Sequence, residues 1–186
     1  MSYAIPTNEL TLGDIKGFKT SALNAGIERA KQKGIAASDQ ELVWREAFPA
    51  TDLGVAAGYA LEYYVTPAAV AAGAWAGCIG LAVPAAPPNL PVGRIAVFYK
   101  IYDPAAAPVV TGVRFLLFAA TTKASFFIQC FVDSKLEPEV WLSEPVVYDP
   151  SDQVNLQMYG RIATPVGGEE LGFGCFIIER VGAVVS

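Results

Sequence analysis

The 186-residue chain contains no histidine, and this decides most of what its side chains could catalyse. Histidine is the most frequent general base and the most frequent metal ligand in proteins. Mechanisms that pair a serine or cysteine nucleophile with histidine are therefore excluded. Gly167 and Gly168 come nearest to a phosphate-binding glycine pattern, and they indicate an ordinary hairpin turn. We expect no enzymatic activity, no catalytic or cofactor-binding residue and no cofactor.

The three cysteines, Cys78, Cys130 and Cys175, lie far apart in apolar stretches. Their odd number and their spacing indicate no disulfide framework. Cys130 and Cys175 also lack a nearby cation that would lower the pKa of a thiol. We expect small buried side chains rather than nucleophiles.

Paired carboxylates are the remaining candidates for acid–base chemistry. Glu137 with Glu139, and Glu169 with Glu170, lie in turn-like sequences. A glycosidase would hold two carboxylates across a cleft at about 5 Å, or at about 6.5 to 9.5 Å. Because carboxylates in turns are mostly solvated, we favour solvated charge and keep hydrolysis as the alternative.

Asp149 and Asp152 could supply hard oxygen ligands for calcium. Their loop lacks the further carboxylates that a shell of about six to eight oxygens demands. Asp149 also belongs to one of two Tyr-Asp-Pro sequences, 102–104 and 148–150, and Asp before Pro is typical of a turn. We favour the turn, and we predict no metal site.

Aromatic side chains offer a route to ligand binding without catalysis. Trp75 and Trp141 could stack on sugars, although packing in a core or an interface is the interpretation we favour. Binding of nucleic acid is disfavoured, because the net charge is −5 and the 13 lysines and arginines form no basic cluster. The same balance argues against a polybasic contact with anionic lipid.

A charge-free stretch over residues 63–93 must be tested as a membrane span. Prolines interrupt it, and the 16 residues between Pro67 and Pro84 are fewer than the roughly 20 that a spanning helix needs. We predict instead a strand over 74–83 and a stiff proline-rich loop over 85–91 that suits burial against a neighbouring subunit. The N-terminus lacks the pattern of a secretory signal, so we expect synthesis in a cytoplasm.

The elements that would position these residues are mostly strands. Apolar runs of strand length alternate with turn signals, at intervals typical of a sandwich or barrel. The runs occupy 94–102, 109–120, 124–132, 139–148, 153–162 and 171–181, with another candidate at 55–65. Residues 41–48 match a strand, although Ser38 and Glu41 also fit a helix capping box; we favour the strand, because Pro49 leaves little room for a helix.

The N-terminal part is predicted to differ from the rest. Residues 1–19 are expected to form an extended arm that contacts other subunits, because Gly13 and Gly17 discourage a helix. Helical spacing of apolar residues predicts a three-turn helix over 20–34, capped by Gly34. We therefore divide the chain into an arm and short helix, 1–34, and a β-barrel domain, 35–186.

The faces of the strands predict how they are covered. The strand at 153–162 should have one wet face, because apolar and polar residues alternate. Its apolar face would carry Val154, Leu156, Met158 and Ile162, and its wet face Asn155, Gln157, Tyr159 and Arg161. The strands at 94–102 and 124–132 are apolar on both faces, so we expect the core on one side and a partner on the other.

The order of these segments resembles the single jelly-roll capsid proteins of viruses. The resemblance rests on ELVWREAFPATDLG at 41–54, on 131–161, and on the closing LGFGCFIIERVG at 171–182. It is greatest to the smaller major capsid protein of tailless icosahedral viruses that enclose an internal membrane and double-stranded DNA. The resemblance covers roughly residues 40–182 and implies an upright single barrel that associates into capsomers. It carries over no functional residue.

We therefore expect an all-β chain, a single antiparallel jelly-roll sandwich of about eight strands. Hydrophobic residues make up 53% and charged residues 17% of the chain, as expected for extensive self-association. The expected function is that of a capsid subunit in the virion of a bacteriophage-like particle. It would contact itself and a second capsid protein, with an internal membrane nearby but not crossed. The alternative is a β-sandwich module that binds carbohydrate or protein.

Overall fold

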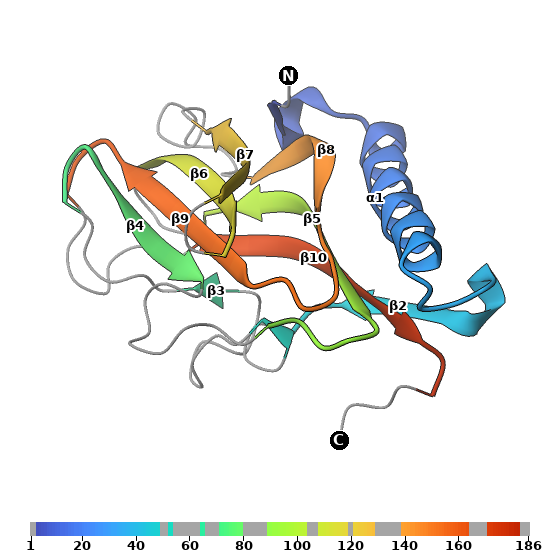
Figure 1. Ribbon diagram of the computed structural model, residues 1–186. Coiled ribbons are helices and arrows are strands. Elements are labelled where there is room, and N and C mark those ends of the chain that lie inside the picture. Colours follow the sequence, from blue (N-terminus) through green and yellow to red (C-terminus); the bar gives the residue numbers. More distant parts are fainter. Residues whose placement is uncertain are drawn as a thin grey trace.

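A computed structural model describes residues 3–48, 52–53, 64–65, 71–79, 89–103, 108–118, 121–128, 139–163 and 171–182. Within them, two antiparallel sheets face each other and one long helix stands beside the larger sheet (Figure 1). The larger sheet contains β1 (Ala4–Pro6), β2 (Leu42–Glu46), β3 (Tyr64–Val65), β5 (Arg94–Tyr102), β8 (Glu139–Tyr148) and β10 (Leu171–Arg180). The smaller sheet contains β4 (Ala74–Ile79), β6 (Val110–Leu117), β7 (Thr121–Phe127) and β9 (Val154–Gly160).

Eight of these strands pair as a jelly roll. β2 pairs with β10, β4 with β9, β5 with β8 and β6 with β7, so each pair along the chain nests inside the previous one. Two further pairings, β5 with β10 and β6 with β9, complete the sheets in the orders β8-β5-β10-β2 and β4-β9-β6-β7. All pairings are antiparallel, as in a double-sheet jelly roll. The fold class predicted from the sequence is confirmed.

Aromatic side chains from both sheets fill the space between them. Phe98 lies 5.2 Å from Phe115 and 6.1 Å from Phe173, measured between ring centroids. Tyr148 is fully buried beside them, and its hydroxyl donates to the carbonyl of Leu116 at 2.9 Å. The described interior of the barrel is therefore a packed core, in which the buried Tyr148 hydroxyl finds a backbone acceptor.

The strand predicted at 41–48 is confirmed as β2, and the alternative helix is wrong. Ser38 and Glu41 do bracket a helical segment, but it is a single turn of 3-10 helix, η2 (Asp39–Glu41). Strands β5 and β8 begin and end where the sequence predicts. β7 begins at Thr121 rather than Ala124, and the predicted strand residues 129–132 lie outside the described residues.

Helix α1 (Leu12–Gln32) begins eight residues before its predicted start at residue 20, so the prediction of an extended arm is wrong for residues 12–19. The Thr11 hydroxyl accepts a hydrogen bond from the Asp14 N–H, and the Asp14 carboxylate accepts one from the Thr11 N–H. This reciprocal cap fixes the first turn. Each glycine costs a helix about 1 kcal/mol relative to alanine, and the packing of Ile15 and Phe18 on the sheet opposes that cost.

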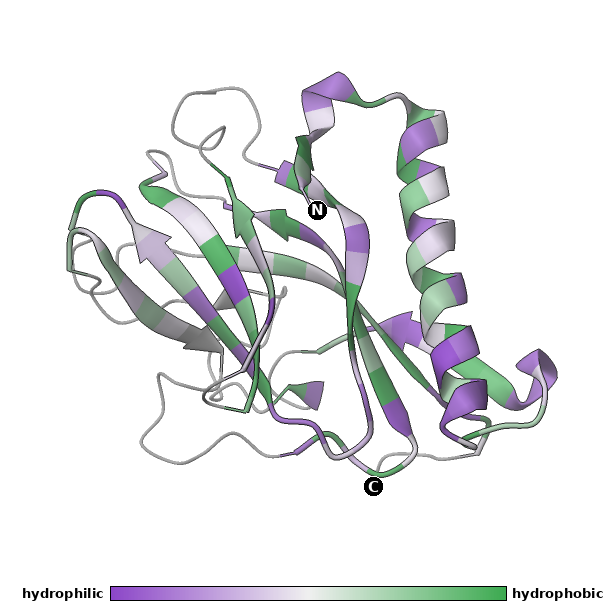
Figure 2. Cartoon of the chain, turned by 45° about the horizontal axis from the view of Figure 1, so that its top comes forward, coloured by the Kyte–Doolittle hydropathy of each residue, from purple (hydrophilic) through white to green (hydrophobic). Residues whose placement is uncertain are grey.

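A second core lies between α1 and the outer face of the larger sheet (Figure 2). The helix contributes Ala22 and Ala30, and the sheet contributes buried residues of β5, β8 and β10: Ile95, Val97, Tyr99, Trp141, Phe176 and Ile178. Both faces of β5 are therefore covered within one chain. The expectation that a partner covers the outer face of 94–102 is wrong, because α1 occupies that place.

The smaller sheet has no helix of the described chain on its outer face. Phe127 of β7 points outward and is 79% exposed, while its neighbour Phe126 is buried in the core. On β9, Val154, Leu156 and Met158 face the core as predicted. Asn155 was expected on the wet face, but it is buried, and its Nδ2 donates to the carbonyl of Phe118 at 2.7 Å.

The charge-free stretch is partly described. Its predicted strand is present as β4, and Leu90, near the end of the proline-rich loop, is buried in the chain's own core. The Leu90 N–H donates to the carbonyl of Asp152 at 2.8 Å, so Leu90 packs on its own chain. Residues 85–88 of the loop lie outside the described residues. In the part of the chain that the structure describes, no helix is both long and apolar enough to cross a membrane.

Candidate functional site

Four carboxylates were considered for acid–base chemistry, and one of them, Glu139, belongs to the described residues. Glu137, Glu169 and Glu170 lie outside them. Glu139, at the start of β8, accepts hydrogen bonds from Lys100 Nζ at 2.9 Å and from Trp141 Nε1 at 3.2 Å. Its carboxylate also accepts a bond from the Thr7 hydroxyl. This glutamate therefore ties the N-terminal segment to the larger sheet.

The Asp149 carboxylate binds cations of the protein itself. Arg29 of α1 donates to both of its oxygens, at 2.6 and 2.5 Å, and Lys33 Nζ lies 3.0 Å away. The hydrogen bond from Arg29 is the largest of the effects that lower the pKa of Asp149. Asp152 accepts from the Asp149 N–H at 2.9 Å and from Lys123 at 3.3 Å. The pair thus forms the turn that the sequence favours, and Asp149 also anchors the last turn of α1.

Cys175 of β10 is buried and free, as expected. Burial raises the pKa of its thiol well above the usual 9.0. Neither Cys130 nor the side chain of Cys78 belongs to the described part. No group of three or more potential metal ligands occurs among the described residues.

A buried network of charges, which sequence reasoning missed, joins β2, β5 and β10. Arg94 contacts Asp52 at 3.0 Å and Glu179 at 3.0 Å, and its side chain is only 6% exposed. Arg45 makes two further bonds to Asp52, at 2.6 and 2.7 Å. Burial alone would raise the pKa of Asp52, but the bonds from Arg45 and the Phe48 N–H, together with the charges of Arg45 and Arg94, lower it below its usual value. With two cations and two anions, the network balances its charge and holds the chain after β2 in place.

An aromatic row crosses the outer face of the smaller sheet. It consists of Trp75, Tyr159 and Phe127, which the strand register aligns on either side of Gly112. The rings of Trp75 and Tyr159 lie 5.4 Å apart between centroids. A Cβ at Gly112 would stand 3.4 Å from the Trp75 ring, so the indole reaches over β9 as far as β6.

Polar side chains stand beside the aromatic row. The Arg114 guanidinium lies 4.4 Å from the centroid of the Trp75 ring, within the range of a cation–π interaction. Its Nε donates to the side-chain oxygen of Gln157. The sequence placed Tyr159 and Gln157 on a common face, but it gave no register to bring Trp75 and Arg114 beside them. Trp141, the other tryptophan considered for sugar stacking, lies under α1 and stacks on Tyr99, so its prediction as a core residue is confirmed.

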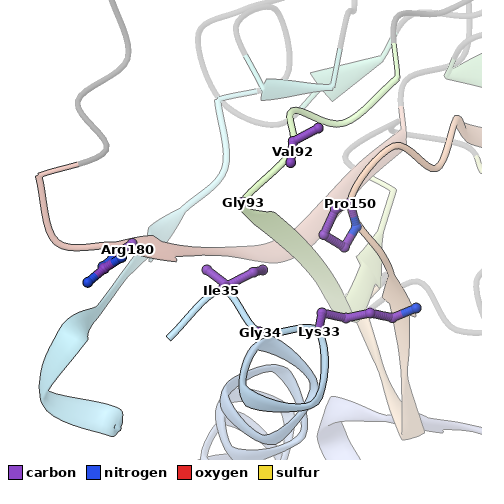
Figure 3. A pocket seen from close by; sticks show the side chains of 7 residues that line it. All are labelled: Lys33, Gly34, Ile35, Val92, Gly93, Pro150 and Arg180. Carbon is purple, nitrogen blue, oxygen red and sulfur yellow. The ribbon is translucent and has the colours of Figure 1, made fainter. Parts of the chain in front are cut away.

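A hollow of about 450 Å³ lies where α1 ends beside β5 and β10 (Figure 3). Two cations border it, but Lys33 pairs with Asp149 at 3.0 Å and Arg180 with Glu41 at 3.3 Å. The other lining residues are small or apolar: Gly34, Ile35, Val92, Gly93 and Pro150. Since both cations already have a carboxylate partner, the hollow is a weaker candidate for ligand binding than the aromatic row.

Comparison with known protein families, curated proteins and solved structures finds no match to this chain.

Proposed function

We propose that the chain is a structural subunit of a viral capsid, which acts by packing against copies of itself and against a second coat protein. Jelly rolls serve mainly as capsid and lectin domains and as barrels that hold a ligand inside. The described interior here is filled by Phe98, Phe115 and Phe173, which leaves function to the outer surfaces. One outer face already carries α1, so the outer face of the smaller sheet is the main surface for partners.

The observation that carries the proposal is the aromatic row on that free face. Tryptophan, tyrosine and arginine dominate the binding energy of protein interfaces, and Trp75, Tyr159 and Arg114 stand together here. Aromatic residues and arginine are also enriched at interfaces, where lysine and glutamate are depleted. A coat protein would bury such a face against a neighbour in the shell. Direct contact with nucleic acid and a membrane-crossing segment form no part of the proposal, although an internal membrane would lie nearby.

Mass spectrometry of purified particles tests this function. We expect the chain at high copy number in virions, and a matched pair of variants locates the contact. Phe127→Asp places a charge at the end of the aromatic row and should reduce incorporation into particles at least tenfold. Val92→Asp changes another highly exposed apolar residue away from the row and should be incorporated normally. Absence of the chain from particles, or equal incorporation of both variants, would contradict the proposal.

The same aromatic row favours one second candidate, a carbohydrate-binding module. Sugar rings stack on aromatic faces, and the Gln157 amide and Arg114 guanidinium could donate hydrogen bonds to hydroxyls beside Trp75. A glycan array with the purified chain, with and without calcium, tests this alternative. Specific binding that Trp75→Ala abolishes, combined with absence from particles, would establish the lectin in place of the capsid subunit.

A further inference from the structure

Three of the four sheet edges in the described structure carry features that discourage further pairing. Proteins protect open edges with short strands, prolines, lysines or bulges, because unpaired backbone groups invite another strand. β1 has only three residues and ends at Pro6, β4 is bulged after Gly77, and β7 carries Lys123. The fourth edge is formed by β2 and, farther along β10, by the two-residue β3. β2 is short, with the sequence LVWRE, but it contains no proline, lysine or bulge and pairs with β10 without a shift of register.

The backbone of β2 leaves a set of groups directed away from β10. The Ala47 N–H donates to Cys175 at 2.8 Å, and the Val181 N–H donates to Glu41 at 2.7 Å. Because these bonds alternate along an antiparallel strand, the odd-numbered residues face β10. Leu42, Trp44 and Glu46 therefore direct their N–H and C=O groups to the open side, where no strand of the described chain lies.

The most exposed side chains of this edge are apolar. Val43 is 43% exposed and Trp44 is 54% exposed, and Phe48, two residues after the strand, is exposed as well. The Trp44 ring meets the Phe176 ring edge-on, with 5.4 Å between centroids, which holds it in place beside the open edge. An edge with free backbone groups and positioned apolar side chains is the surface that strand addition uses.

We propose that β2 pairs antiparallel with β2 of a second copy of this chain, around a two-fold axis through Val43. Such a contact is isologous, because each copy offers the same strand. The backbone restricts the choice of register. Only registers that place even-numbered residues opposite even-numbered residues let the open N–H and C=O groups bond to each other. An axis through a residue meets this condition, and an axis between two residues does not.

The side chains then select among the permitted registers. With the axis at Val43, Leu42 lies opposite Trp44 of the other copy, and Val43 lies opposite itself. Apolar pairs that face each other across strands stabilise a sheet. Glu41 would lie opposite Arg45, but both already have partners in their own chain, Arg180 for Glu41 and Asp52 for Arg45, so the apolar pairs decide the register. With the axis at Trp44 instead, Leu42 would face the carboxylate of Glu46, and Val43 would face Arg45. The apolar residues of β2 thus match each other around Val43, which is the reason to assign a second copy rather than another protein.

The pairing would join the larger sheets of two copies into one continuous sheet. It goes beyond the proposed function, since a two-fold contact could serve a capsid subunit or a binding module equally. A five-residue strand makes a small interface, so we expect a concentration-dependent dimer that multivalent assembly would strengthen.

Cross-linking tests the contact and its register together. Residues that face each other in a pair without mutual hydrogen bonds have Cα atoms about 4.5 Å apart, which suits a disulfide. Val43→Cys should therefore form a disulfide-linked dimer on mild oxidation. Ile162→Cys is the matched control, because Ile162 is also exposed but follows β9 of the smaller sheet. We expect at least tenfold faster cross-linking at position 43, above the background of the unchanged chain.

A charge variant tests the same contact without a cross-linking reaction. Val43→Lys would place two cations opposite each other and should raise the dimer dissociation constant at least tenfold in sedimentation experiments. Ile162→Lys adds the same charge outside the contact and should leave dimerisation unchanged. The inference is overturned if the unchanged chain stays monomeric at millimolar concentration, if Val43→Cys cross-links no faster than Ile162→Cys, or if Trp44→Cys cross-links faster than Val43→Cys.

The outcomes separate this inference from the proposed function. If particles contain the chain but Val43→Cys does not cross-link, the β2 contact is wrong and the capsid proposal stands. If the chain dimerises through Val43 but is absent from particles, the β2 contact stands and the capsid proposal is wrong.

Discussion

Gly26 of α1 lies so close to Ile178 of β10 that a Cβ built on the glycine would stand 2.2 Å from Ile178 Cδ1. Val97 Cγ2 of β5 would lie 2.7 Å away. The helix can approach the larger sheet at this distance only because position 26 has no side chain. The glycine costs the isolated helix about 1 kcal/mol relative to alanine. In return, it permits the close packing of the second core.

Gly26→Ala is therefore expected to destabilise the fold, although alanine favours a helix. Forcing an extra methyl group into a packed core costs about 1 to 3 kcal/mol. Gly17→Ala is the matched control in the same helix, because no atom lies within 4 Å of a Cβ at position 17. We expect Gly17→Ala to raise the free energy of unfolding by about 0.5 to 1 kcal/mol and Gly26→Ala to lower it, measured by denaturant titration. Equal effects at both positions would contradict the close contact.

The buried charge network makes a second prediction. Arg94→Met removes the cation between Asp52 and Glu179, and among the described residues it leaves Glu179 one cation, Arg45 at 3.4 Å. Breaking a buried pair in this way costs about 3 to 5 kcal/mol. Arg180→Met breaks an exposed pair with Glu41 and should cost about 0 to 1 kcal/mol. Urea unfolding of the two variants should separate them clearly, and similar losses would show that the network does not stabilise the fold.

Stability should also fall in acid, because three carboxyl groups have a lowered pKa in the folded chain. The pKa values of Asp14, Asp52 and Asp149 all lie below the usual 3.8. The folded chain therefore holds these protons less tightly than the unfolded chain. The resulting stabilisation is complete above pH 3.8 and is lost as the pH falls through the lower folded values. Unfolding followed from pH 7 to pH 2 should show this loss, and Asp149→Asn should flatten it; an unchanged slope would contradict the ion pair with Arg29.

The sequence predicted the strands better than it predicted what covers them. The ends of β5 and β8 followed from the two Tyr-Asp-Pro sequences, 102–104 and 148–150, because Asp before Pro is typical of a turn. The sequence did not predict that α1 covers the outer face of β5. Gly13 and Gly17 disfavour a helix over residues 12–19, and the helix forms there because the Thr11–Asp14 cap and packing on the sheet offset that cost. The aromatic row was missed because it depends on cross-strand register. Alternation along one strand gives the face of a residue but not its neighbours.

The N-terminal segment gives the last prediction, because its role differs from that of a free arm. Phe18 stacks on Trp141 with 6.3 Å between centroids, and Ile15 packs on the same second core. Deletion of residues 1–19 removes both side chains and uncovers Trp141. We expect a fall in the denaturation midpoint and a red shift of tryptophan fluorescence. Deletion of residues 1–9 keeps all of α1 and its cap and removes only β1 and η1 (Thr7–Glu9), so it should have a much smaller effect. If both truncated chains unfold like the intact one, the segment 10–19 does not belong to the fold and acts as the free arm that the sequence suggested.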